Sequence, residues 1–116
     1  MSLALEEILH LPGLHEMTVR AGAHNLQRRV RWPYVAENEG IAEWVMGGEL
    51  VFVTGINHPR GEANLLSLVE DGEAVGITWM VILTGGTFIQ AIPPAVITRA
   101  EQLGLPLIEQ IGRAHV

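Results

Sequence analysis

The sequence lacks cysteine and lysine, and each absence removes several kinds of chemistry. Without cysteine there is no disulfide, no thiolate nucleophile and no zinc site built on sulfur. Because all seven strongly basic side chains are arginines, a Schiff-base lysine and the lysine of a phosphate-binding P-loop are also excluded. Asp71 is the one aspartate of the sequence, which removes the paired aspartates of many magnesium sites and those of EF-hand loops.

Nucleophiles and metal-ligand patterns are scarce as well. Serine occurs as Ser2 and Ser67, and neither lies in a Gly-x-Ser-x-Gly motif. We therefore expect no catalytic residue, no metal site, no cofactor and no enzymatic activity. The alternative left open is an accessory domain of an enzyme, with Glu37 or Glu49 as a base. The histidines do not repeat at a metal-binding spacing and are interpreted as scattered surface residues; they are His10, His15, His24, His58 and His115.

Length and charge set the broad class. A chain of 116 residues has the size of one domain. Its formal net charge of −6 argues against a nucleic-acid-binding surface, so we interpret the basic cluster Arg28, Arg29 and Arg31 as a solvated turn and strand edge. The longest strongly apolar run, Val75–Leu83, is far shorter than the roughly 20 residues of a membrane helix, and the N-terminus does not resemble a signal peptide. We expect a cytoplasmic protein that contacts neither membrane nor nucleic acid.

Apolar periodicity predicts alternating strands and helices. The continuous run Leu50–Val53 suits a strand covered on both faces of a parallel sheet. Apolar residues recur at helical spacing in Glu62–Ala74, and Pro93-Pro94 begins a second helix. The sequence thus predicts a small single α/β domain, with a mostly parallel sheet of about five strands, flanking helices and right-handed crossovers. Further strands are expected at Met17–Ala21, Val30–Ala36, Ile77–Leu83 and Leu105–Ile108, and a first helix near Leu5.

Several short motifs resemble one known family. They are Val30-Arg31-Trp32, Glu37, Trp44, Gly47-Gly48-Glu49-Leu50-Val51 and Thr54-Gly55, followed by Ile92-Pro93-Pro94, Ala100 and Leu103-Gly104-Leu105-Pro106-Leu107-Ile108-Glu109. Over residues 3–110 the chain resembles the N-terminal domain of PucR-type bacterial transcription regulators, the purine catabolism regulators. It is also similar to small α/β modules that precede other domains, such as the N-terminal domain of HPr kinase. Val53 departs from the family, because many relatives have a second threonine before Thr54.

The resemblance implies a regulatory module. We expect residues 1–110 to form a sensory, dimerising domain that binds a small metabolite, with an intermediate of purine degradation as one candidate. Residues 111–116 are expected to be a linker or a cloning remnant, and the resemblance places the DNA-binding helix-turn-helix outside this chain. The alternative is a ligand-free module that dimerises or docks on its neighbour. Trp32, Trp44 and Trp79 each adjoin an apolar run, so we expect them in the core or in a dimer interface.

The candidate ligand site follows from the polar residues at predicted strand ends. Thr54-Gly55 and Thr84-Gly85-Gly86-Thr87 each follow a strand, and ligands of open α/β sheets bind at that edge. Glu49 follows a double glycine, and its carboxylate either faces a ligand or accepts hydrogen bonds from turn amides. Arg60 precedes a helix N-terminus, where it either binds an anion or belongs to a solvated loop. The candidate ligand-binding residues are Glu37, Glu49, Thr54, Gly55, Asn57, Arg60, Thr84, Gly85 and Thr87.

Structural alternatives exist for the remaining candidates too. The two threonine–glycine motifs are also expected simply as tight turns at strand exits. Glu37 and Glu39 flank a loop that we expect near Glu49, where paired carboxylates have acid–base capacity. Their alternative is solvation at the surface. Positions in space decide between these alternatives.

Overall fold

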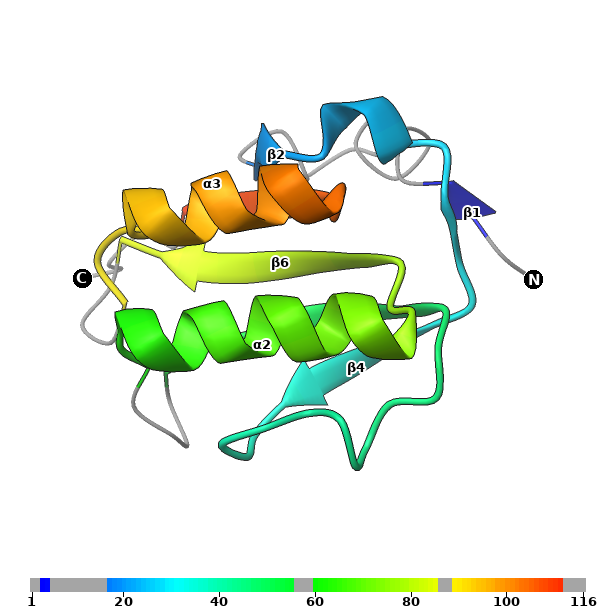
Figure 1. The fold of residues 1–116 in the computed structure, drawn as a ribbon, viewed down its shortest axis with the longest axis horizontal. Helices are drawn as coiled ribbons and strands as arrows, with labels where there is room; N and C mark the ends of the chain where they lie inside the picture. Colours follow the sequence, from blue (N-terminus) through cyan, green and yellow to red (C-terminus); the bar gives the residue numbers. More distant parts are fainter. Residues whose placement is uncertain (1–2, 5–16, 56–59, 86–88, 112–116) are drawn as a thin grey trace, which may run out of the picture.

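A five-stranded sheet forms the centre of the protein (Figure 1). The computed structural model describes residues 3–4, 17–55, 60–85 and 89–111. The predicted α/β class is confirmed, because four strands of the sheet are parallel and one is antiparallel to its neighbour. The strand order is β2-β7-β6-β5-β4, with β2 antiparallel to β7. The strands are β2 (Met17–Ala21), β4 (Trp32–Ala36), β5 (Glu49–Val53), β6 (Trp79–Thr84) and β7 (Leu107–Ile111).

The N-terminal half adds short elements beside this sheet. β1 (Leu3–Ala4) pairs antiparallel with β3 (Arg29–Val30), and η1 (Ala23–Asn25) is a 3₁₀ turn. The sequence predicts one strand over Val30–Ala36, but the structure divides it at Arg31. The division reflects a change of partner, because β3 pairs with β1 whereas β4 pairs with β5.

Two helices connect the parallel strands, and both follow their sequence signals. α2 (Glu62–Val75) and α3 (Pro94–Leu103) end at Gly76 and Gly104, whose φ angles of 96° and 75° disfavour any residue with a side chain. α3 begins with Pro94. In the first turn of a helix the backbone N–H has no partner within the helix, so a residue without this N–H is tolerated there. The helix predicted near Leu5 lies outside the described residues. α2 buries the predicted stripe of Leu65, Leu68, Val69 and Gly72.

α2 and α3 lie on the same face of the sheet (Figure 1). Because side chains alternate along a strand, β5 and β6 contribute residues to two separate cores. This confirms that Leu50–Val53 belongs to a strand covered on both faces. The core on the helix side includes Val51, Val53, Met80, Ile82 and Leu107. The core on the opposite face includes Val30, Leu50, Trp79, Val81 and Ile108.

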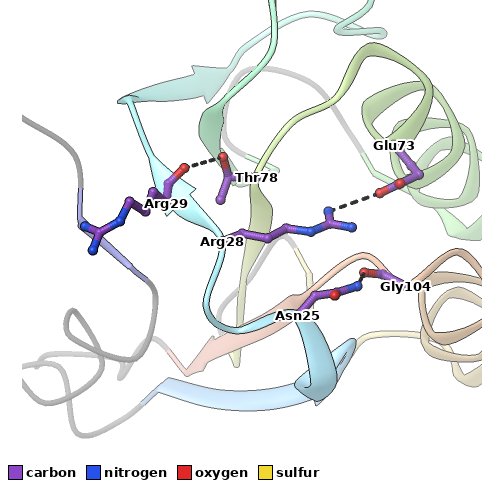
Figure 2. A network of polar contacts seen from close by, with 6 residues as sticks. All are labelled: Asn25, Arg28, Arg29, Glu73, Thr78 and Gly104. Carbon is purple, nitrogen blue, oxygen red and sulfur yellow. Dashed lines mark hydrogen bonds and ion pairs between the residues drawn. The ribbon is translucent and has the colours of Figure 1, made fainter.

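The segment 22–30 ties the amino ends of the parallel strands to both helices (Figure 2). Of the basic cluster in this region, Arg29 and Arg31 are exposed as predicted, whereas Arg28 is half-buried against α2. This edge of the sheet is therefore closed by contacts within the chain. The contacts are Asn25 Nδ2 to the Gly104 carbonyl oxygen (2.6 Å), Arg28 Nη1 to Glu73 Oε1 (3.4 Å) and Thr78 Oγ1 to the Arg29 carbonyl oxygen (3.0 Å).

The three tryptophans occupy different environments. Trp79 is fully buried, as expected for a core residue. Trp32 and Trp44 are 45% and 57% exposed, so a place in the core is wrong for these two. Trp32 is the first residue of β4, and Trp44 lies in the connection between β4 and β5. Their place in a dimer interface stays a prediction.

Candidate functional site

Glu49 is the first residue of β5 and is 2% exposed. Its carboxylate accepts hydrogen bonds from the turn that precedes the strand. Oε2 accepts from the main-chain N–H of Met46 at 2.7 Å, and Oε1 accepts from that of Gly47 at 2.8 Å. Trp32 donates from Nε1 to Oε2 at 3.3 Å. Burial raises the pKa of Glu49, but the hydrogen bonds outweigh burial and the net pKa is lowered. Of the two roles that the sequence suggests, acceptance from turn amides is the one the structure shows.

The turn that holds Glu49 depends on two glycines. Gly47 and Gly48 have φ angles of 115° and 85°, as the double glycine predicts. A Cβ atom at Gly48 would lie 2.7 Å from Cδ of Arg31, so glycine lets the arginine side chain cross the turn. Upstream, the main-chain N–H of Val45 donates to the carbonyl oxygen of Ile41 at 3.1 Å, which forms a short helical turn.

Glu49 does not lie near Glu37, contrary to the sequence-based expectation. β4 and β5 are parallel, and their register pairs Trp32 with Glu49 and Ala36 with Val53. Glu37 therefore follows the far end of β4, about 16 Å along the strand direction from Glu49. The expected carboxylate pair does not form.

Arg60 precedes α2 and is 7% exposed, and the chain itself accepts from all five of its N–H groups. Burial lowers the pKa of Arg60 and the charge of Glu39 opposes this effect, but a guanidinium stays charged in proteins. The side chain of Arg60 is therefore not solvated, and an anion would find its donors already engaged. Arg60 joins the carboxyl ends of β4 and β5 instead. Its acceptors are the carbonyl oxygens of Ala36, Asn38, Glu39 and Thr54 and Oδ1 of Asn64, at 2.7–3.5 Å.

Thr84, at the end of β6, is 1% exposed and donates its hydroxyl proton to Oε2 of Glu109. The other carboxylate oxygen of Glu109 accepts from Nε of Arg20 at 2.7 Å. This chain of contacts links β6, β7 and β2 on the helix side of the sheet. Neither Glu109 nor Arg20 is singled out by the sequence, although a charged residue inside the apolar strand Leu107–Ile111 is a usable signal.

The candidate residues therefore fall into two groups at opposite edges. Thr54, Gly55, Arg60 and Gly85 lie at the carboxyl edge with Glu37. Glu49 lies at the amino edge. Asn57 and Thr87 lie outside the described residues.

The carboxyl edge differs from that of a doubly wound sheet. The chain passes through β4, β5, β6 and β7 in spatial order, and α2 and α3 cover one face. Ligands in doubly wound sheets bind where the strand order reverses. The described parallel strands contain no such reversal, so the usual crevice is not formed between them.

Two hollows instead flank the segment after β4, beside α2. One of about 390 Å³ is lined by Asn38, Glu39, Glu43, Trp44 and Asp71, among others. The second, of about 560 Å³, is lined by Glu39, Gly40, Ala63, Asn64 and Ser67. Both are open to solvent and share Glu39 and Gly40, so they are neighbours beside α2, and we call the two together the Glu39 groove. Arg60 and Asn64 fix its floor, because both donate to the carbonyl oxygen of Glu39, at 3.2 and 2.9 Å.

The described ranges hold neither a cluster of metal-binding side chains nor a membrane-crossing helix. No three histidine, aspartate or glutamate side chains there are grouped so as to hold a metal ion. No helix in the same ranges has both the length and the apolar content of a membrane-crossing segment.

Comparison with known proteins gives a family match and similar solved structures. A family model described as the purine catabolism regulatory protein-like family (PucR) matches residues 7–113. The curated proteins contain no match to the chain. A solved structure is similar in fold, with a TM-score of 0.63 at 14% identity: the CBS and DRTGG domains of the regulatory region of Clostridium perfringens pyrophosphatase, in complex with the activator diadenosine tetraphosphate. The alignment covers 92% of this chain and 40% of that one.

Proposed function

This chain belongs to the purine catabolism regulatory protein-like family, and from that premise we propose that it is the effector-sensing module of a bacterial transcription regulator. The module itself is not an enzyme and does not touch DNA, and the helix-turn-helix lies in another part of the regulator. It acts in the cytoplasm by biasing the geometry of the attached domains. An effector does so when it has different affinities for two conformations.

The Glu39 groove is the observation that supports an effector site best. It lies between the segment after β4 and the exposed side of α2, and it combines an exposed indole, Trp44, with amide and carboxylate side chains. Small-molecule sites commonly pair an apolar surface with a few fixed polar groups. Arg60 supplies the fixed geometry, because its hydrogen bonds to Asn38 and Glu39 hold the segment in place.

The lining of the groove selects the chemistry of the effector. Glu39, Glu43 and Asp71 are all carboxylates, and no cation is among the lining residues. Carboxylates accept from N–H donors and repel anions. The proposed effector is therefore neutral or cationic, planar enough to cover Trp44, and rich in N–H groups. A neutral purine-degradation intermediate meets these requirements.

The same lining argues against a nucleotide phosphate in this groove. The Clostridium perfringens structure contains diadenosine tetraphosphate, a polyanion. Arg60, which holds the segment that lines the groove, has its N–H groups engaged by the chain. We therefore infer a different class of effector for this chain.

Thermal unfolding against a panel of N–H-rich metabolites and nucleotides tests this function. A ligand at a hundredfold excess over its dissociation constant adds about 2.7 kcal/mol to the free energy of unfolding. Glu39→Gln and Asp71→Asn should weaken binding, and Trp44→Phe should remove the accompanying change in fluorescence. Glu62→Gln, an exposed carboxylate outside the groove, is the matched control. A panel without any stabilising compound, or unchanged affinity in both groove variants, would count against an effector site here.

The second candidate is a ligand-free interaction module. The observation that favours it is the exposure of large apolar side chains around β4, with Trp32 at 45%, Val35 at 51% and Met46 at 85%. Isolated exposed apolar residues are normal, whereas a group of them marks an interaction surface. Dimerisation of the chain is compatible with both candidates.

A further inference from the structure

We propose that two copies of this chain pair through the outer edge of β4, antiparallel about a two-fold axis at Tyr34. β4 is the last strand in the order β2-β7-β6-β5-β4 and has β5 on one side. Among the described residues, no other strand lies on its outer side. Strand edges of this kind are templates for pairing with another chain.

Exposed apolar residues are concentrated on β4 and on the connection that follows it. Four of the five exposed large hydrophobic residues in the described ranges fall between positions 32 and 46. They lie on β4 and on the connection that leads back into β5. We call this set the β4 patch: Trp32, Val35, Trp44 and Met46.

The charged residues on either side of β4 indicate that the partner at its outer edge is a second copy of this chain. Arg31 precedes Tyr34 by three residues and Glu37 follows it by three. An antiparallel pairing centred on Tyr34 therefore places Arg31 of one copy opposite Glu37 of the other, and the two-fold axis repeats the contact.

Other arrangements lose this complementarity. A parallel pairing in register puts arginine opposite arginine and glutamate opposite glutamate, and like charges directly opposite are destabilising. An antiparallel pairing whose centre moves by one residue no longer places Arg31 of one copy opposite Glu37 of the other. The charges thus specify both the direction and the register of the pairing. This complementarity depends on where Arg31 and Glu37 lie along the strand, whatever contacts they make within their own chain.

Arg31 is also held in position before any partner arrives. Its guanidinium carbon lies 6.0 Å from the centroid of the Trp32 ring, within the range of a cation–π contact. Its side chain crosses Gly48, where any Cβ atom would collide with it. Less side-chain freedom is therefore lost on association.

Pro33 explains why the pairing ends at a dimer. Proline lacks an N–H group and is confined to edge strands in sheets, where it limits main-chain pairing. A dimer held by β4 must therefore rely on the β4 patch and the charge pairs more than on a long ladder. Because each copy has one β4 edge, a two-fold pairing also uses that edge up.

Sedimentation and light scattering of charge-reversal variants test the proposal. The native chain of 12.7 kDa should have a mass of about 25 kDa as its concentration is raised through the micromolar range. Arg31→Glu and Glu37→Arg each place like charges together at both ends of the pairing, so each should weaken dimerisation at least tenfold. The double variant Arg31→Glu/Glu37→Arg restores opposite charges across the axis and should restore the dimer.

Control measurements distinguish the loss of the interface from a change in net charge and from unfolding. Thr98→Glu/Gln102→Glu changes net charge as much as Arg31→Glu, on the exposed side of α3, and should remain dimeric. Circular dichroism checks that each variant is folded, and Glu37→Arg avoids the packing of Arg31 on Gly48. A monomeric native chain, single variants that still dimerise, or a double variant that stays monomeric would each overturn the proposal. The proposed pairing rests on the dimerisation in the proposed function and names the surface that it uses. Its test measures the mass of the chain in solution, so a failure to bind an effector would not change the result.

Discussion

Arg60 and Asn38, 22 residues apart in the chain, are joined by a 2.7 Å hydrogen bond from Nη2 to the main-chain carbonyl oxygen. The same guanidinium also holds Ala36 and Glu39, so one side chain fixes the exit of β4 and the floor of the Glu39 groove. A charged group that is this buried is stable because each of its donors has an acceptor. The geometry of the proposed effector site thus depends on a residue that has no donor left for the effector.

Arg60→Lys should destabilise the protein although it keeps the charge. An ammonium has three donors and no planar fork, so at least two of the five acceptors lose their partner. Leaving buried acceptors unsatisfied costs about 1–3 kcal/mol, which a urea unfolding curve will show as a lower midpoint. Arg99→Lys alters an exposed ion pair with Glu70 and should change stability by about 0.5 kcal/mol or less. Equal midpoints for Arg60→Lys and the native chain would contradict the assigned role.

Glu49→Gln should lower stability at neutral pH and lose that effect in acid. The pKa of Glu49 is lowered in the folded chain, so its contribution is present above the unfolded pKa of about 4.5 and disappears as pH falls through the folded pKa. At neutral pH the amide should cost about 1–2 kcal/mol, because it offers one acceptor oxygen in place of two. Urea unfolding at several pH values from about 7 to about 3 should show the two curves converging. Glu43→Gln, at an exposed carboxylate, is the control, and a difference that persists in acid would refute the assignment.

Features set by short stretches of chain are those that the sequence predicts. The stripe Leu65, Leu68, Val69 and Gly72 specifies α2, because helical spacing and burial coincide there. Gly76 and Gly104 end their helices for a local reason, the left-handed backbone. The apolar run Leu50–Val53 indicates a strand covered on both sides, and the sheet provides that cover.

Features set by the assembly of distant segments are those that the sequence misses. Arg60 lies in a stretch rich in glycine, asparagine and proline, which normally indicates a solvated loop. Its burial follows from carbonyl groups that converge only once β4, β5 and α2 are in place. The sequence could have predicted that Glu37 and Glu49 lie far apart. Glu37 follows β4, whereas Glu49 begins β5, the parallel neighbour of β4. Strand exits and strand entries lie at opposite edges of a parallel sheet.

Gly22→Ala should be strongly destabilising. Gly22 has a φ angle of 69°, and an added Cβ would lie 2.4 Å from the main chain of Leu105, which has no flexible end to move aside. The left-handed backbone costs about 1–2 kcal/mol with a side chain, and overpacking adds about 1–3 kcal/mol. Gly61→Ala is the matched control, because its Cβ meets no atom within 4 Å and its backbone is extended. If both variants unfold at the same temperature, the close approach of Gly22 to Leu105 does not determine the stability of the protein.

Thr84→Val should destabilise the chain by removing one partner of a buried carboxylate. Valine keeps the shape and the strand preference of threonine, so the change isolates the hydroxyl that donates to Glu109. Glu109, 8% exposed, then retains Arg20 as its other partner, and the unsatisfied oxygen costs about 1–3 kcal/mol. Thr98→Val, on the exposed side of α3, should be nearly neutral.

A double-mutant cycle makes this test specific to the contact between side chains. Glu109→Gln and Thr84→Val should be non-additive, because each removes the same hydrogen bond, and residues in one network couple by about 0.5–3 kcal/mol. Thr84→Ser retains the hydroxyl and should restore most of the lost stability in urea unfolding. Additive effects, or a serine variant as unstable as the valine variant, would show that Thr84 acts through its packing. In that case the β6 exit would be held by apolar contacts instead of by Glu109.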